Sequence, residues 1–184
     1  MHRTYRTLTA WSVVAVLSAL STIRAEVIDS APGGFSLRNT VEIASPPSAV
    51  YDVLVKEIGN WWDSAHTYSG NSHNLSIQDK PNGCFCESFE PDGNVRHGVV
   101  VFASRGKSLR LSGGLGPLQE MAVVGTMSYE FKSHESETQL TMIYRVGGYH
   151  PDGLATLATG VDSVLRMQLI RLKSYIEKGS PKSD

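Results

Sequence analysis

Cysteine is scarce in this sequence. Only two occur in 184 residues, Cys84 and Cys86, with one residue between them. On a strand, both side chains would point to one face and their Cα atoms would lie about 6.7 Å apart, at the edge of disulfide geometry. We therefore predict two thiols without a mutual bridge. So few cysteines exclude a disulfide-rich scaffold, and the spacing lacks the Cys-x-x-Cys pair typical of structural zinc sites.

Several other signatures are missing. The formal net charge is −1 and no run of basic residues is present, which argues against nucleic acid and against an anionic membrane surface as partners. The sequence has no serine nucleophile elbow, no paired-aspartate site and no dinucleotide-binding fingerprint. The stretch from Gly113 to Glu120 lacks the lysine and the spacing of a phosphate loop, so we interpret it as a lid-like turn between strands.

The first 25 residues have the features of a secretory signal peptide. Arg3 and Arg6 form a positive start, Leu8–Leu20 is mainly apolar, and Ala25 is a small residue at the expected cleavage point. The apolar stretch is short for a bilayer span of ~20 residues, and an uncleaved anchor is the alternative reading. We predict export to the periplasm or the medium, with no membrane span after signal removal.

The rest of the chain is long enough for one domain with a sizeable core. Residues 26–33 contain Pro32 and Gly33 and few apolar positions, so we predict a linker there. Residues 34–179 are predicted to form the domain, and residues 180–184 a short tail.

The longest amphipathic stretch runs from Asp152, a candidate N-cap, to about Lys178, with Gly179 as a stop signal. Its apolar positions recur at the helical period and fall on one face. That stripe consists of Leu154, Ala158, Val161, Leu165, Leu172 and Ile176. Gln168 also falls on it. A buried amide needs partners, so this side chain either bonds a neighbouring element or faces a cavity.

Strands dominate the chain before this helix. An alternating strand at Phe35–Ile43 is followed by Ser45-Pro46-Pro47 and a short helix ending near Trp61. Turn signals then separate further strands, which indicates antiparallel hairpins. They are predicted at Leu75–Gln78, Gly83–Phe89, Val95–Ala103, Ser108–Ser112, Val123–Lys132 and Gln139–Val146. The predicted fold class is α+β, with one twisted antiparallel sheet wrapped around the final helix.

This element order resembles that of the SRPBCC superfamily, which includes the START, birch-pollen-allergen and polyketide-cyclase relatives and has the helix-grip fold. Ser45-Pro46-Pro47, Trp61-Trp62, Ser108-Leu109-Arg110-Leu111 and the closing helix carry the resemblance. It is most similar to the branch that contains the C-terminal domain of the activator of the Hsp90 ATPase. Those activators are intracellular, so the export signal argues against a co-chaperone role.

The resemblance implies a hydrophobic cavity between the sheet and the long helix, and a hydrophobic small molecule as the partner. We expect no cofactor and no metal. Polar groups expected at the mouth would orient the ligand through hydrogen bonds. The candidate ligand-binding residues are Trp62, Tyr68, His97, Leu111, Met127, Tyr129, Met142, Tyr144, Val161, Leu165 and Gln168.

One constellation could carry chemistry. If Phe89 pairs with Val95 across the hairpin, His97 lies opposite Glu87 on the next strand. A carboxylate beside an imidazole fixes its tautomer and raises its pKa, as a general base requires. Alternatively, His97 joins Cys84 and Cys86 in a soft metal site with His66, or these residues have only packing roles.

Three functions remain open from sequence. The first is an exported binding protein for an apolar or amphipathic molecule. The second is a cyclase- or hydrolase-like enzyme that uses His97, Glu87 and His66. The third is a partner-binding module that uses the sheet face or the rim at Trp61-Trp62.

Overall fold

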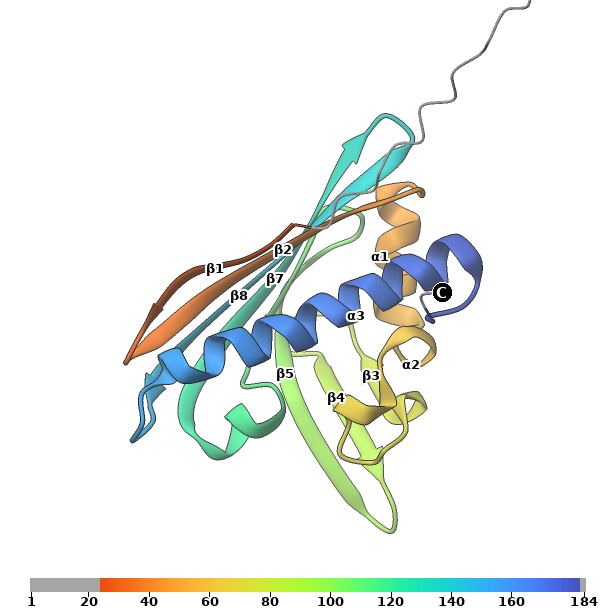
Figure 1. Cartoon of the computed structure of the whole chain (residues 1–184). Helices are drawn as coiled ribbons and strands as arrows, with labels where there is room; N and C mark the ends of the chain where they lie inside the picture. Colours follow the sequence, from red (N-terminus) through yellow and green to blue (C-terminus); the bar gives the residue numbers. More distant parts are fainter. Residues whose placement is uncertain (1–23, 183–184) are drawn as a thin grey trace, which may run out of the picture.

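The computed structural model describes residues 24–182. Most of the predicted signal peptide, residues 1–23, and the last two residues of the tail lie outside this range. The described chain forms an eight-stranded antiparallel sheet in the order β1-β2-β8-β7-β6-β5-β4-β3. The long helix α3 crosses one face of the sheet, and the short helices α1 and α2 lie near its C-terminal end (Figure 1). This is the predicted helix-grip α+β fold.

The strands agree with the alternation in the sequence. Strand β6 has the predicted bounds, and the other predicted strands differ from the predictions by at most a few residues at each end. The strands are β1 (Arg24–Ala31), β2 (Gly34–Ile43), β3 (Leu75–Ile77), β4 (Cys84–Phe89), β5 (Gly93–Ser104), β6 (Ser108–Ser112), β7 (Ala122–His134) and β8 (Glu137–Tyr149).

Strand β1 corrects the linker prediction for residues 26–33. Most of that segment pairs antiparallel with β2, from Glu26 opposite Arg38 to Ala31 opposite Gly34. Every residue of β1 is exposed. The strand is held by backbone hydrogen bonds at the sheet edge and buries little apolar surface, so hydrophobic alternation gives no signal for it.

The first helical segment is split in two. Helix α1 (Pro47–Lys56) follows Pro46, whose fixed φ suits the helix start, and no side chain caps it. Helix α2 (Ile58–Trp61) begins after a break at Glu57. Short 3-10 turns η1 (Ser64–His66) and η2 (Ser72–Asn74) lead from there to β3.

Helix α3 (Ala158–Lys178) starts later than predicted. Asp152 does not cap it, because Gly153 adopts a positive φ of 75° and the chain first forms the 3-10 turn η4 (Leu154–Leu157). The predicted C-terminus is confirmed: Gly179 has the left-handed conformation that ends helices, with φ 72°. The apolar stripe is also present, since Ala158, Leu165 and Leu172 are buried in the core.

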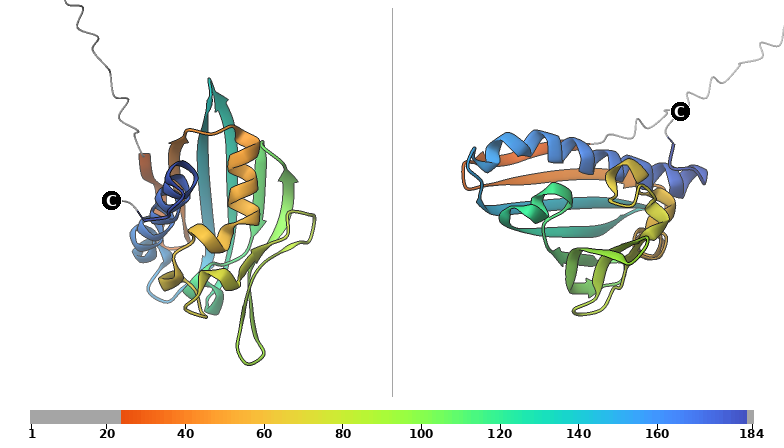
Figure 2. Two further views of the ribbon diagram at one scale, coloured as in Figure 1. Left: turned by 90° about the vertical axis from the view of Figure 1, so that its right-hand side faces the viewer. Right: turned by 90° about the horizontal axis from the view of Figure 1, so that it is seen from below.

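The position of α3 on the sheet is off-centre. Its strand contacts are mainly with β2 and β1, at one side of the sheet (Figure 2). Polar contacts hold it there: Asn39 of β2 donates to Asp162 at 2.8 Å, and Lys173 donates to the carbonyl of Glu42 at 2.7 Å. The half of the sheet that contains β3, β4 and β5 therefore lacks a direct cover by this helix.

The prediction that Cys84 and Cys86 are free thiols is wrong in this structure, where they form a disulfide with Cα atoms 5.3 Å apart. The estimate of about 6.7 Å assumed a regular strand. The pairing of β4 with β5 shifts register between Phe85 and Cys86, which marks a β-bulge. The extra, unpaired residue is His97 of β5, because Phe85 pairs with Gly98 and Cys86 with Arg96. The ladder is therefore irregular beside the two cysteines, and their Cα atoms lie within disulfide range.

The disulfide leads to a direct prediction. Protein purified without reductant and then denatured should contain no free thiol, and its mass should be lower by two hydrogens than that of the reduced form. Thiol titration and intact mass spectrometry measure both quantities, and the reduced sample is the control. Two thiols before reduction would contradict the bridge.

Candidate functional site

A pocket with a volume of about 810 Å³ lies beside α3 in the described chain. It lies between the first half of α3 and the strands β3, β4 and β5, the part of the sheet that α3 leaves uncovered. Two irregular segments close its sides: residues 62–68 and the 3-10 turn η3 (Gly116–Glu120) with its flanks. The lining residues are Trp62, Ala65, His66, Thr67, Tyr68, Leu75, Phe85, His97, Leu115, Gly116, Pro117, Leu118, Glu120, Met121, Thr156, Leu157, Gly160, Val161, Val164 and Leu165.

Hydrogen bonds hold the first wall, residues 62–68, in place. Gln168 accepts from the backbone N–H of Asp63 at 2.9 Å, and Arg171 donates to the carbonyl of Trp61 at 2.9 Å. Gln168 and Arg171 lie one turn apart on α3. The helix therefore fixes the chain at the exit of α2 through side chains that are not part of the pocket.

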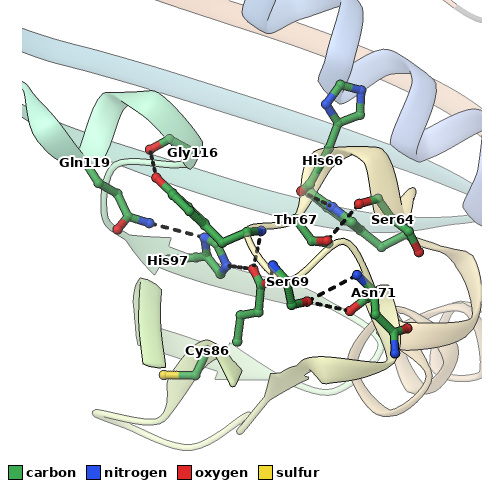
Figure 3. Close-up of polar contacts among 12 residues, drawn as sticks. Ser64, His66, Thr67, Ser69, Asn71, Cys86, His97, Gly116 and Gln119 are labelled. Carbon is green, nitrogen blue, oxygen red and sulfur yellow. Dashed lines mark hydrogen bonds and ion pairs between the residues drawn. The ribbon is translucent and has the colours of Figure 1, made fainter. Parts of the chain in front are cut away.

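The second wall is connected to the first. The hydroxyl of Tyr68 donates to the carbonyl of Gly116 at 3.0 Å, which joins the two irregular segments at one edge of the pocket (Figure 3). Tyr144 supports the second wall from the core, because its hydroxyl accepts from the N–H of Leu115 and donates to the carbonyl of Gly113, each at 3.2 Å. The stretch predicted as a lid-like turn does form a wall of the pocket.

Aromatic rings form a continuous series along the floor. The ring centroids of Trp62 and Phe85 are 5.9 Å apart, those of Phe85 and His97 5.0 Å, and those of His97 and Tyr68 6.0 Å. Such separations are typical of favourable ring pairs. The interplanar angles are 71°, 41° and 31°, so the rings offer a ligand a polarizable side made of tilted faces and edges.

Glu87 and His97 form a buried pair: Nε2 of His97 lies 3.0 Å from Oε2 of Glu87. The register proposed for this hairpin was wrong by two residues, since Phe89 pairs with Gly93 and Glu87 with Val95. A shift of two keeps the same face, so His97 is the diagonal neighbour of Glu87 instead of its direct partner.

The charge state of the pair follows from its surroundings. Burial alone would raise the pKa of Glu87, but hydrogen bonds from Ser69, Tyr68 and His97 outweigh it and hold this pKa below its ordinary value. Burial lowers the pKa of His97, and the opposing effect of Glu87 does not restore it. At neutral pH, Glu87 is therefore ionised and His97 neutral.

This charge state fixes the tautomer of His97. Because Glu87 can only accept, the proton of the neutral ring is on Nε2. Nδ1 is then an acceptor, and the side-chain amide of Gln119 lies 3.2 Å from it and donates to it (Figure 3). Both ring nitrogens thus have partners within the protein.

The predicted ligand-binding residues separate into two groups. Trp62, Tyr68, His97, Val161 and Leu165 line the pocket. The others do not, which corrects the predicted position of the cavity. They are Leu111, Met127, Tyr129, Met142, Tyr144 and Gln168, all buried in the core. The central strands β7 and β8 pack against α1 and the interior, so their inward side chains fill the core instead of facing open space.

Sequence reasoning missed most of the pocket walls. Leu115, Met121, Gly160 and Val164 were not predicted as site residues, although all line the pocket. Leu115 and Met121 belong to an irregular segment without a hydrophobic period. The only sequence signal for this segment was the interpretation of Gly113 to Glu120 as a lid-like turn. Gly160 and Val164 lie one turn apart on α3, beside the predicted stripe.

The soft metal site considered for Cys84, Cys86 and His97 is not formed. The two sulfurs are bonded to each other, and the sulfur of Cys86 points away from His97 (Figure 3). Within residues 24–182, no three His, Cys, Asp or Glu side chains are grouped closely enough to bind a metal ion. In the same range, no helix combines the length and the apolar character needed to cross a membrane.

Solved structures share this fold. A conserved protein of unknown function from Enterococcus faecalis aligns with TM-score 0.58 and 16% identity, over 90% of this chain and 83% of its own. The solution structure of CalU16 from Micromonospora echinospora aligns with TM-score 0.58 and 12% identity, over 91% and 81%. The Aha1 dimer from Colwellia psychrerythraea gives TM-score 0.53 and 15% identity, over 78% and 97%.

No family model and no curated protein matches the sequence. The structural likenesses therefore show the fold alone, a helix-grip α+β domain.

The buried pair predicts an acid-sensitive fold. The pKa values of both groups are lower in the folded chain than in the unfolded chain. As the pH decreases, the unfolded chain therefore takes up protons before the folded chain does. This difference begins at the ordinary pKa of 6.5 for His97 and of 4.5 for Glu87. The free energy of unfolding should therefore fall as the pH decreases from 7.5 to 5, by about 1.4 kcal/mol for each unit by which the His97 pKa is lowered.

Urea unfolding at several pH values tests this slope in three proteins. In His97→Gln, the free energy of unfolding should no longer show the contribution of His97 to its decrease with falling pH. In His66→Asn, a change at an exposed histidine, this contribution should remain. Equal slopes in the wild type and His97→Gln would contradict the assigned direction.

Proposed function

We propose that this protein binds an apolar or amphipathic small molecule in the pocket beside α3. The pocket of about 810 Å³, with mainly apolar and aromatic walls, is the observation that carries the proposal. Ligand pockets typically have volumes of about 300–1,000 Å³, apolar linings and a few polar groups that orient the ligand. Here the polar lining groups include His66, Thr67, Glu120 and Thr156.

The geometry favours binding over catalysis by the Glu87–His97 pair. A general base needs a free acceptor within reach of the substrate. Nε2 of His97 is bonded to Glu87, and Nδ1 is occupied by Gln119. His66 also lines the pocket, but its ring is directed away from His97, so the two histidines do not form a joint acid–base site (Figure 3).

The partner-binding alternative has less support. Its strongest surface was the predicted rim at Trp61-Trp62, yet both rings are buried, with 1% and 7% of their surfaces exposed. Their ring centroids are 5.5 Å apart, and they pack within the core. Neither ring forms an exposed aromatic patch for another protein.

Filling the pocket tests the binding proposal. A side chain added at Gly160 would enter open space, since a Cβ there meets no atom within 4 Å, and this residue lines the pocket. Gly160→Phe should therefore weaken binding of the neutral dye Nile red by about tenfold or more, which corresponds to ~1.4 kcal/mol. Fluorescence titration measures the dissociation constant.

Thr159→Phe is the matched control, because it adds the same ring at the neighbouring exposed position outside the lining. It should leave the affinity for Nile red within about twofold of that of the wild type. Both variants should keep the wild-type urea midpoint, to within the small change that is usual for a surface substitution. Absence of Nile red binding to the folded wild type, or equal affinities of the two variants, would overturn the proposal.

We also propose that the protein is exported and that its signal peptide is removed near Ala25. The basic start, the apolar run and the small residue at position 25 support this. The Cys84–Cys86 disulfide adds support, because disulfides persist in oxidising compartments outside the cytoplasm.

N-terminal sequencing of the protein from a bacterial host with intact export is the test of this step. Mature protein from the periplasm or medium should begin close to Glu26, and an export-blocked host should retain a chain beginning at Met1. Soluble cytoplasmic protein that begins at Met1 in the intact host would refute export.

A further inference from the structure

Building on the proposed function, we propose that the ligand carries a positively charged amine, bound at the pocket mouth by Glu120 between the rings of Tyr68 and Tyr149. The apolar part of the ligand would occupy the pocket beside α3. The site thus selects amphipathic cations over anions with the same skeleton.

The charges of the lining support this selection. Glu120 is the only carboxylate among the residues that line the pocket in the described chain, and none of those residues is a lysine or arginine. Glu120 is exposed and forms no salt bridge with any residue between 24 and 182. A ligand anion would therefore meet a negative charge without a compensating positive one.

Glu120 also borders a second, smaller cavity. This cavity, about 400 Å³ in volume, shares Pro117, Glu120 and Met121 with the main pocket and adds Tyr149 and His150. Glu120 therefore stands where the two cavities meet, at the outer end of the main pocket.

Two exposed tyrosines each line a cavity together with this carboxylate. Tyr68 lines the main pocket with 46% of its surface exposed, and Tyr149 lines the smaller cavity with 70% exposed. Burial is the main cause that raises the pKa of Tyr68, and the nearby charge of Glu120 raises it further. Glu120 is thus close enough to Tyr68 for their charges to interact.

The two rings suit a cation better than a neutral hydrogen-bonding group. The hydroxyl of Tyr68 already donates to Gly116, so the face of its ring is what remains for a ligand. Aromatic faces attract ammonium groups, by about 0.5–1 kcal/mol each at exposed sites. A carboxylate that shares its cavity linings with two exposed tyrosines combines this attraction with direct charge pairing.

Three pyrene derivatives with one skeleton test the inference: 1-pyrenemethylamine, 1-pyrenemethanol and 1-pyrenecarboxylate. The titrations are carried out at pH 8 and low salt. The amine should bind about tenfold tighter than the carboxylate, with the alcohol between them. The preference should shrink at high salt, because the site is exposed and charges there are screened.

Glu120→Gln should reduce the preference for the amine over the carboxylate to about twofold or less. Glu137→Gln is the matched control, because it removes the same charge at an exposed position at the opposite end of β8 from Tyr149. It should keep the wild-type preference.

The possible results distinguish the two proposals. If all three probes bind and Gly160→Phe weakens all three, but the carboxylate binds as tightly as the amine, the charge selection is wrong and the binding function stands. An unchanged preference in Glu120→Gln would also overturn the selection. If no probe binds to the folded protein, both proposals fail.

Discussion

The hydrogen bond from Asn39 to Asp162 joins the fully buried amide of one strand to α3, and much of the structure depends on it. A buried amide without a partner costs about 1–3 kcal/mol, so this contact fixes where the helix crosses β2. Once α3 lies over β1 and β2, it does not cover β3, β4 and β5. The pocket occupies that remaining space, which explains why it lies away from the centre of the sheet.

Polar side chains outside the pocket then determine its shape. Gln168 fixes residues 62–68 through the N–H of Asp63, and Tyr144 fixes the segment before η3 through Leu115 and Gly113. Both residues were predicted to touch a ligand, and both instead bond to the backbone of a wall. The irregular segments lack a periodic apolar face that would anchor them to the core. The buried hydrogen bonds therefore give the pocket a defined form in the absence of a ligand.

The fold was largely predictable because its signals are periodic. The alternation in β2 and β6 and the stripe of α3 each extend over several residues and survive small errors at the ends. The errors arise where a single residue changes the geometry. The two cysteines lie beside the bulge at His97, and their distance departs from that in a regular strand. The edge strand β1 buries no stripe that alternation could reveal. The Glu87–His97 pair was predicted because a two-residue shift preserves the face, whereas the walls depend on loops whose conformations are set by tertiary contacts.

The hydrogen bond from Gln119 to His97 bears on how such a pocket can change during evolution. Gln119 is exposed, belongs to the 3-10 turn η3, and supplies the only partner of Nδ1 of His97 in the described chain. A small side chain at position 119 would leave a neutral imidazole with a free lone pair, held in one tautomer by a buried carboxylate and facing a space that excludes much of the water. Those are the elements of a general base. A binder and an acid–base catalyst built on this scaffold are thus separated by one surface substitution, with the core unchanged.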